Sequence, residues 1–225
     1  MKDSKSIKFS SKANTLDFFQ DKITKSRIEE LYFFTVKEWK ENKKEIREDI
    51  KKKFSSLIVV RSSAEGEDSI SNSQAGKFKT VLNVNPKKKN SIDNAITEVI
   101  RSYKTKVKYD SVNQILIQTQ TLDSQTSGVI FTKTLENGSP YYVINFEDGI
   151  STDSVTKGLQ DNIIKIHNNT KNNNIPQKWR KLIIAVKEIE KISKNQRLDI
   201  EFAITENDVV IFQVRPLTAI NKIST

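Results

Sequence analysis

The chain has 225 residues, of which 36% are hydrophobic and 29% charged, with a formal net charge of +10 and no cysteine. This balance predicts a folded globular protein, because chains of low hydrophobicity lack the apolar surface that offsets the entropy of ordering. The lack of cysteine excludes disulfides and thiolate metal sites. No apolar run approaches the roughly 20 residues that span a bilayer, and the N-terminus has no signal-peptide core. We therefore expect a cytoplasmic protein with no membrane partner.

The positive charge comes mostly from lysine, since only 7 of the 38 basic residues are arginine. Nucleic-acid binding is one interpretation, because basic patches release counterions from phosphates. Proteins that read base edges rely on the bidentate fork of arginine, whereas these lysines are spread over the whole length beside many Asn and Ile residues. A compositional bias explains the charge better, so no nucleic-acid partner is expected, although polyanionic ligands would be attracted in general.

The hydrophobic pattern predicts helices and strands in mixed order. Thr35 followed by Glu38 is typical of a capping box at a helix start, and Pro176 suits the first turn of another helix. Helices are predicted over 13–23, 36–54, 91–107 and 176–194, and strands over 57–60, 77–84, 114–120, 128–132, 141–146, 197–205 and 209–214. This order favours an α+β fold with antiparallel sheets over a doubly wound parallel sheet.

The last two predicted strands each have two distinct faces, by the two-residue period of a strand. In the first strand the side chains on one face are all apolar: Leu198, Ile200, Phe202 and Ile204. In the second, the period puts Val210, Phe212 and Val214 on one face and Ile211, Gln213 and Arg215 on the other.

A three-residue loop over 206–208 would place Glu201 opposite Gln213 and Asp199 opposite Arg215. Carboxylate and amide oxygens are the hard ligands that Mg²⁺ prefers, and Mg²⁺ keeps phosphate and water as its other ligands. Arginine adds bidentate phosphate contact. This hairpin face therefore suits a nucleotide triphosphate, but ordinary cross-strand polar pairs explain it equally well at this point.

A second polar segment follows the predicted strand at 57–60. Arg61-Ser-Ser-Ala-Glu-Gly-Glu-Asp68 brings a guanidinium and two hydroxyls to the end of a buried strand, and Ser73-Gln-Ala-Gly-Lys-Phe-Lys-Thr-Val-Leu-Asn-Val84 comes next. Taken alone, both stretches suit a polar loop between strands, with Gly76 as a turn residue.

Together these segments resemble the nucleotide-binding domain of the phosphoenolpyruvate synthase and pyruvate phosphate dikinase family. The family pattern is similar to Val-Arg-Ser-Ser-Ala-x-x-Glu-Asp, followed by Ala-Gly-x-x-x-(Thr/Ser)-x-Leu-Asn-Val. Three further stretches look like family motifs: Ser127-Gly-Val-Ile-Phe-Thr132, Asp199-Ile-Glu-Phe-Ala203 and Gln213-Val-Arg-Pro-Leu-Thr218. Five ordered motifs between residues 57 and 218 make the resemblance specific.

A weaker match lies near the N-terminus. Ser11-Lys-Ala-Asn-Thr-Leu16 is similar to the family's Gly-Gly-Lys-Gly-x-x-Leu, but the glycines around the lysine are absent. Those glycines would let backbone N–H groups approach phosphate. Lys12 is therefore either a phosphate ligand or one lysine among 31.

The resemblance implies an ATP-grasp fold of the α+β class, in which two subdomains with mostly antiparallel sheets clamp ATP between them. The expected subdomains are residues 1–115 and 116–225. ATP and Mg²⁺ are the implied cofactors.

The resemblance also implies roles for individual residues. Lys12, Arg61 and Arg215 would contact the ATP phosphates and stabilise charge during transfer, which makes them the expected catalytic residues. Glu201 and Gln213 would bind Mg²⁺.

The remaining nucleotide contacts are implied in the same way. The backbone of Gln120, Thr121 and Leu122 would read the adenine edge at the hinge between the two halves of the fold. Thr132 would line the nucleotide site. Asp153 stands where the family has a ribose-binding Glu, without the two glycines that precede it in the family.

The family's chemistry passes through a phosphohistidine on a separate swivelling domain. The chain has one histidine, His167, in Ile164-Lys-Ile-His-Asn-Asn-Thr170, and this context does not match the family's carrier motif. A histidine without activating partners is unsuited to the role, so we expect a strand-end histidine. The expected partners are therefore a phosphohistidine domain, in the same longer protein or in trans, and a small-molecule acceptor. Alone, the chain should bind ATP without completing the net reaction.

The acceptor is suggested only by finer likeness within the family. Gln74-Ala-Gly-Lys-Phe-Lys-Thr-Val-Leu-Asn83 looks more like capsule-associated members, and the whole segment is most similar to bacterial glutamine kinases, which phosphorylate the amide nitrogen of L-glutamine for capsular phosphoramidate. Phosphoenolpyruvate synthesis and rifamycin-type phosphotransfer are alternatives within the class. A non-catalytic ATP-binding regulatory module is an alternative from another class.

Overall fold

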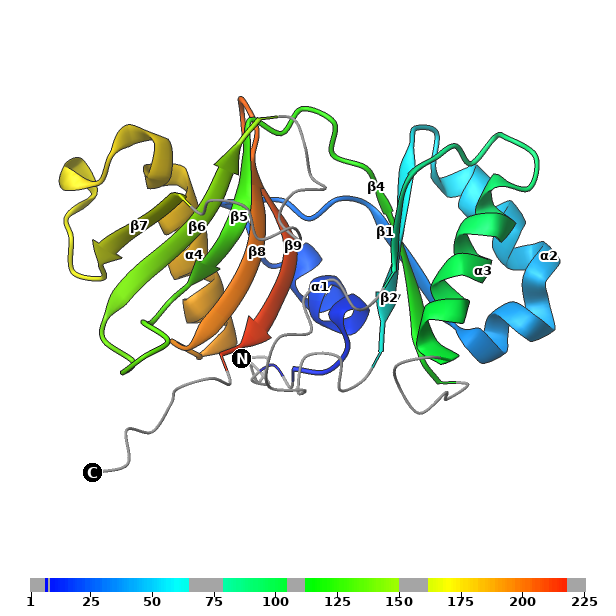
Figure 1. The fold of residues 1–225 in the computed structure, drawn as a ribbon, viewed down its shortest axis with the longest axis horizontal. Coiled ribbons are helices and arrows are strands. Elements are labelled where there is room, and N and C mark those ends of the chain that lie inside the picture. The colour runs from blue at the N-terminus through cyan, green and yellow to red at the C-terminus, as the bar shows by residue number, and fades with distance from the viewer. Residues whose placement is uncertain (1–6, 8, 65–78, 105–111, 150–161, 218–225) are drawn as a thin grey trace, which may run out of the picture. The chain divides into compact units, whose positions relative to one another are not determined.

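The computed structural model describes residues 7, 9–64, 79–104, 112–149 and 162–217. Its helices are α1 (Lys12–Gln20), α2 (Val36–Lys53), α3 (Ser91–Lys104) and α4 (Gln177–Ser193), with a short 3₁₀ helix, η2, at Asn172–Asn174. Its strands are β1 (Leu31–Thr35), β2 (Ile58–Ser63), β3 (Thr80–Val84), β4 (Gln114–Thr119), β5 (Thr126–Phe131), β6 (Tyr141–Asp148), β7 (Asn162–His167), β8 (Leu198–Ile204) and β9 (Val209–Pro216). These elements form two sheets with their helices (Figure 1), so the predicted α+β class with antiparallel sheets is confirmed. Within the described residues, no helix is long and apolar enough to cross a membrane.

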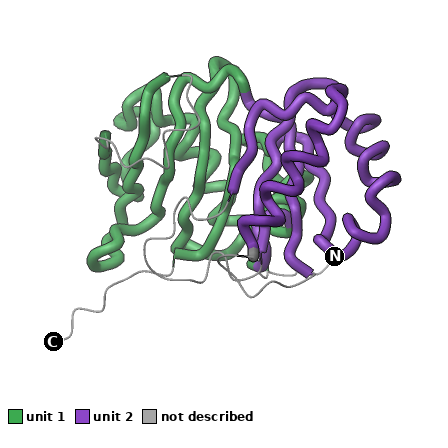
Figure 2. The backbone as a smooth tube through the Cα atoms, turned by 45° about the vertical axis from the view of Figure 1, so that its right-hand side comes forward, with its two compact units in different colours: residues 1–9, 14–28, 122–225 green, residues 10–13, 29–121 purple. Residues whose placement is uncertain are grey.

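The chain divides into two compact units, drawn in different colours in Figure 2. Unit 2 consists of residues 10–13 and 29–121, and unit 1 of residues 1–9, 14–28 and 122–225. The expected boundary after residue 115 differs from this division, because it would pass through β4. That strand pairs with β1 and β2 along its whole length, which places it in unit 2.

Unit 2 is built on an antiparallel sheet with the strand order β1-β4-β2-β3. Helices α2 and α3 cover one face of it (Figure 1). The core under these helices includes Trp39, Ile50, Val60, Ile96 and Ile117, each at most 5% exposed. Burial of this apolar surface is the main force that holds helices and sheet together.

Helix α2 begins at the predicted capping box. The Thr35 hydroxyl accepts a hydrogen bond from the Glu38 N–H at 3.1 Å, and the Glu38 carboxylate accepts one from the Thr35 N–H at 2.6 Å. Strand β1 ends at the same threonine and was not predicted, because no turn residue separates it from the helix. The other strand missed by the sequence pattern is β7, which lies at an edge of the second sheet.

Unit 1 is built on an antiparallel sheet with the order β7-β6-β5-β8-β9. Helix α4 packs on one face, where the Trp179 ring makes edge contacts with Phe146 on β6 and Phe202 on β8, at centroid distances of 4.6 and 6.5 Å. Cross-strand pairing places Glu201, Gln213 and Arg215 on the opposite face. These three polar residues therefore lie on the face of the sheet that does not pack against α4.

The C-terminal hairpin has the predicted pairs and one unpredicted irregularity. Glu201 lies opposite Gln213 and Asp199 opposite Arg215, as expected. Near the turn, however, Ile204 pairs with Val209, and the register shifts between Glu201 and Phe202. The loop is therefore one residue longer than expected. A β-bulge in β9 compensates for the extra residue, so that the pairs further from the turn still have the predicted register.

This bulge corrects the predicted faces of β9. Ile211 pairs with Phe202 and is fully buried on the α4 side, whereas Phe212 is the extra residue and is only half-buried. Simple alternation along β9 predicts Phe212 on the apolar face and Ile211 on the polar one. The inserted residue inverts the alternation only on the turn side of the bulge.

Residues before β1 return to unit 1 and extend its sheet edge. The Arg27 N–H donates to the Val209 carbonyl at 2.9 Å, and the Ile211 N–H donates to the Arg27 carbonyl at the same distance. The backbone of β9 thus has a partner on its outer side at this point, which shields part of an otherwise exposed strand edge.

Candidate nucleotide-binding site

The polar face of unit 1 carries both predicted metal ligands side by side. Glu201 on β8 and Gln213 on β9 are direct cross-strand neighbours. Gln213 is 3% exposed, whereas Glu201 is half-buried. A carboxylate and an amide on adjacent strands offer two oxygens to one small cation.

Arg215 is held in place by the carboxylate opposite it. Its Nε and Nη2 atoms each lie 2.7 Å from Oδ2 of Asp199, which is 6% exposed. Such a charge-assisted contact restricts the rotamers of a long side chain. Asp199 therefore positions the guanidinium next to Glu201 and Gln213, a role that the sequence pattern showed only as a cross-strand pair.

Thr132 follows β5 and is fully buried. Its hydroxyl donates to the Gln196 carbonyl and accepts from the Leu198 N–H, both at 2.8 Å. These two bonds link the end of β5 to the backbone at the start of β8, so the hydroxyl has a structural role. Its expected place in the nucleotide site stays a prediction.

In unit 2, Lys12 and Arg61 are brought to the same region of the sheet. Arg61 and Ser63 alternate with the core residues of β2, so both lie on the face opposite α2 and α3. The Ala13 N–H donates to Ser63 Oγ at 2.8 Å, which ties the start of α1 to the end of β2. The lysine next to this contact is 8% exposed, so it is not an ordinary surface lysine.

The predicted hinge residues have well-defined contacts. The Gln120 N–H donates to the Leu57 carbonyl at 2.9 Å, and its side chain binds Asn83 through both amide atoms, at 2.6 and 3.0 Å. The Thr121 hydroxyl donates to the buried Glu29 carboxylate at 2.7 Å, and Leu122 is 55% exposed. An adenine edge would thus have to be read by backbone groups of this segment other than the Gln120 N–H.

Some expected site residues lie outside the described part of the chain. Asp153 is one of them, as are residues 65–78, which include the second half of the Arg-Ser-Ser segment and Gly76. Thr218, at the end of the last motif, also lies outside it. Their expected roles remain predictions from the sequence.

His167 ends β7, which confirms the expected strand-end position. Its ring meets Tyr141 edge-on at a centroid distance of 5.0 Å, and its Nδ1 accepts a hydrogen bond from the Asn169 N–H at 3.2 Å. Among the residues that the structure describes, no three His, Cys, Asp or Glu side chains gather into a potential metal site.

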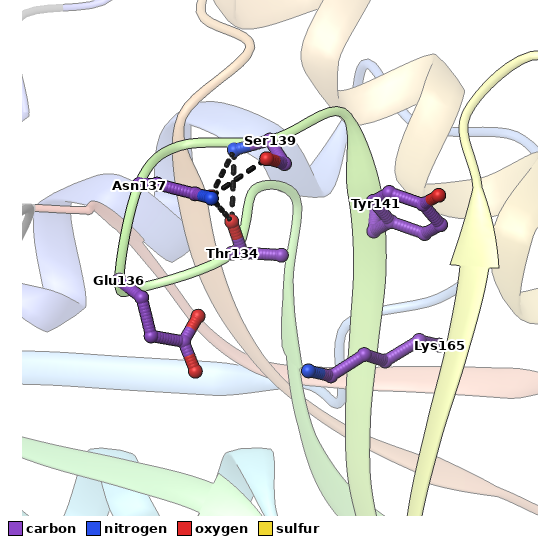
Figure 3. A pocket seen from close by; sticks show the side chains of 6 residues that line it. All are labelled: Thr134, Glu136, Asn137, Ser139, Tyr141 and Lys165. Carbon is purple, nitrogen blue, oxygen red and sulfur yellow. Dashed lines mark hydrogen bonds between the residues drawn. The ribbon is translucent and has the colours of Figure 1, made fainter.

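A separate pocket of about 530 Å³ lies at the turn between β5 and β6 (Figure 3). The turn is tightly hydrogen-bonded, because Asn137 Oδ1 accepts from the hydroxyls of Thr134 and Ser139 at 2.6 and 2.7 Å. None of the predicted site residues lines this pocket, whose walls are Thr134, Glu136, Asn137, Ser139, Tyr141 and Lys165.

Comparison with protein-family models gives the class of the protein. The model described as "Pyruvate phosphate dikinase, AMP/ATP-binding domain" matches residues 29–192. The chain therefore belongs to this family, as the sequence motifs predicted. By this description, the chain is an AMP/ATP-binding domain of the pyruvate phosphate dikinase family. No curated protein matches the chain.

Solved structures show the same fold at low sequence identity. The acetyl-coenzyme A synthetase 1 of Ca. Korarchaeum cryptofilum has a TM-score of 0.57 at 10% identity, over 93% of this chain and 92% of that one. The D-alanine-D-alanine ligase of Helicobacter pylori has a TM-score of 0.50 at 10% identity, over 93% of this chain. This chain spans 51% of that ligase, so it matches only about half of the enzyme. The fold is thus α+β of the ATP-grasp type with two antiparallel sheets.

Proposed function

We propose that this domain binds Mg·ATP and passes a phosphoryl group to a histidine on another domain, from which it reaches the amide nitrogen of L-glutamine. The observation that carries the proposal is the cluster of Glu201, Gln213 and Arg215 on the face of the unit 1 sheet that α4 leaves uncovered. The family supports ATP as the ligand. The Mg²⁺ role and the acceptor are the finer parts of the proposal.

The donor set fits Mg²⁺. Glu201 and Gln213 provide two adjacent hard oxygens, and Mg²⁺ ordinarily takes one or two protein ligands and fills its other positions with phosphate and water. When bound, the ion would neutralise charge on the phosphates that it bridges. The protein's part is to hold the carboxylate and the amide oxygen at neighbouring positions of a rigid sheet.

The cationic side chains suit phosphate binding. In unit 1, the Arg215 guanidinium is oriented by Asp199. In unit 2, Arg61 lies in the second half of β2, and Lys12 is the first residue of α1. Fixed positive charge aimed at phosphoryl oxygens stabilises the transition state of phosphoryl transfer. We assign the phosphate-binding role to these three residues, with the hinge backbone at 120–122 for adenine.

The onward steps rest on the sequence. His167 lies in an edge strand against Tyr141, which does not suit a phosphoryl carrier, so the carrier belongs to another domain. L-Glutamine is favoured as acceptor by the likeness of residues 74–83 and of the Lys-, Asn- and Ile-rich chain to glutamine kinases.

Calorimetric titration with Mg·ATP tests the site. We expect Glu201→Gln, Arg215→Ala and Arg61→Ala each to weaken binding about tenfold or more, because each removes a charged contact worth about 1.5–3 kcal/mol. Glu206→Gln and Arg101→Ala are matched controls at exposed positions, and both should bind as the wild type does. Unchanged binding in all three site variants would show that the nucleotide lies elsewhere.

A second experiment tests the transfer. The chain is incubated with a family phosphohistidine domain, labelled ATP and a panel of acceptors that includes L-glutamine and pyruvate. Phosphorus NMR then distinguishes a P–N product from a P–O product. A P–N bond on glutamine supports the proposed acceptor, and a P–O product would replace it. Binding of ATP without any labelling of the histidine would identify a regulatory module instead.

A further inference from the structure

Two buried polar side-chain atoms on the face of the unit 1 sheet opposite α4 lack hydrogen bonds. They are Ser127 Oγ on β5 and Asn145 Oδ1 on β6, and neither has a partner among the described residues. Ser127 is 2% exposed, and Asn145 is half-buried. Folded proteins pair nearly all buried polar atoms, so two such atoms close together require an explanation.

The two side chains are neighbours on one face of the sheet. Ser127 pairs with Glu147, and Asn145 pairs with Val129, two residues further along β5. The two residues therefore occupy diagonal positions, from which side chains on the same face reach the same ligand.

This pair lies in line with the proposed metal ligands. Val129 is flanked by Asn145 on one side and Glu201 on the other, and Glu201 is flanked in turn by Gln213. All these side chains lie on the face opposite α4. Glu201 and Asn145 are separated by two inter-strand spacings, a distance of about 10 Å. That span is comparable to the distance from the metal-bridged phosphates to the sugar of an extended nucleotide.

The chemistry of the unpaired atoms points to a hydroxyl ligand. A carbonyl oxygen such as Asn145 Oδ1 needs a donor, which phosphate oxygens cannot supply, and the serine hydroxyl both donates and accepts. Sugar hydroxyls also donate and accept. We propose that Ser127 and Asn145 bind the ribose hydroxyls of ATP and so distinguish ribonucleotides from deoxyribonucleotides. This inference rests on the proposed ATP site.

Titration with ATP, 2′-deoxy-ATP and 3′-deoxy-ATP in the presence of Mg²⁺ tests the assignment. The wild type should bind at least one deoxy analogue about tenfold more weakly than ATP, the effect of one or two lost hydrogen bonds. In Asn145→Leu, ATP binding should weaken about tenfold, and the ratio between ATP and that analogue should approach one. Asn162→Leu makes the same change at an exposed position on the other face of the sheet and should keep the wild-type ratio.

A second readout needs no nucleotide. Asn145 Oδ1 is buried without a donor, and replacing the side chain by an apolar group of similar size removes the desolvation penalty of that oxygen. Asn145→Leu should therefore raise the melting temperature of the nucleotide-free protein while it weakens ATP binding. Ser127→Ala should leave this temperature unchanged or raised. This combination separates a ligand-binding residue from one that only supports the fold.

The possible outcomes separate the two proposals. If the wild type binds no ATP, the proposed function fails, and this inference fails with it. If ATP binds and the ratio to the deoxy analogues is the same in Asn145→Leu as in the wild type, only the ribose assignment is overturned. A lower melting temperature for Asn145→Leu would also overturn it, because the side chain would then have a structural partner.

Discussion

Single side chains in this domain owe their positions to partners that are distant in sequence. Arg215 is oriented by Asp199 across the hairpin, and the Thr121 hydroxyl binds Glu29, which is 92 residues away along the chain. Each contact fixes a long or mobile group before a ligand arrives. Preorganisation of this kind lowers the entropy lost on binding.

Gly128 is required by close approach of two strands. A Cβ atom at this position would lie 2.1 Å from the Asn145 carbonyl oxygen and 2.9 Å from Phe146 Cα. Both are backbone atoms, so no side-chain rotation relieves the clash. We expect Gly128→Ala to lower the free energy of unfolding by about 1–3 kcal/mol or more, as overpacking does.

Urea unfolding measures this effect, with Ser127→Ala as the control on the same strand. A glycine tolerated as alanine without loss of stability would mean that β5 and β6 lie further apart than the structure shows. The sequence marked Gly128 as part of a family motif, but only the paired strands show why no side chain fits there.

At the scale of elements, two helices of unit 2 are linked by an ion pair. The Arg47 Nε and Nη2 atoms on α2 donate to the Asp93 carboxylate on α3 at 3.0 and 2.7 Å, and Lys43 Nζ lies 3.2 Å from it. Burial alone would raise the pKa of Asp93, but the hydrogen bonds from Arg47 and Lys43 outweigh it and hold this pKa below the ordinary value of 3.8. A carboxylate whose pKa is lowered in the folded state stabilises the fold when the pH is above its ordinary pKa. This stabilisation is lost as the pH falls through the pKa of the folded state.

We therefore expect Asp93→Asn to destabilise the protein by about 1 kcal/mol at pH 7, since the pair is partly exposed and screened by solvent. The difference from the wild type should shrink below pH 3.8 and vanish at lower pH. Denaturation curves at a series of pH values measure it, with Asp123→Asn in a loop as the control. A difference that persists in acid would point to packing rather than charge.

The elements themselves were largely predictable. Within the part of the chain that the structure describes, the capping box at Thr35 and Glu38, the four α-helices and seven of the nine strands follow from local patterns. Strand β1 was missed because it runs directly into α2. The bulge in β9 was missed because periodicity alone does not reveal an inserted residue, although the Glu201–Gln213 pair was still predicted correctly.

At the scale of the whole molecule, the units are not simple consecutive halves. Residues 14–28 belong with 122–225. The Glu188 carboxylate on α4 accepts from the Thr24 N–H at 2.9 Å, the Thr24 hydroxyl at 2.7 Å and the Lys25 N–H at 2.9 Å. This carboxylate therefore anchors an early segment of the chain to a late helix.

We expect Glu188→Ala to lower the free energy of unfolding by about 1–2 kcal/mol, because three hydrogen bonds to a charged acceptor are lost at a partly exposed site. Amide exchange at residues 24–27 should accelerate more than exchange in β8. Glu206→Ala, in the exposed hairpin loop, is the control. Equal acceleration throughout unit 1 would argue that the segment is held by its other contacts.

The sequence by itself determined the family, the α+β class and the two pairs Glu201–Gln213 and Asp199–Arg215 of the C-terminal hairpin. These features depend on local periodicity, turn chemistry and ordered motifs, all of which are written in consecutive residues. Only the tertiary structure decided which chain segments share a unit and which face of the unit 1 sheet lies opposite α4. It also decided that Ser127 Oγ and Asn145 Oδ1 lie without hydrogen-bond partners on the same face as Glu201. These features depend on packing between residues that are distant along the chain, which no local pattern contains.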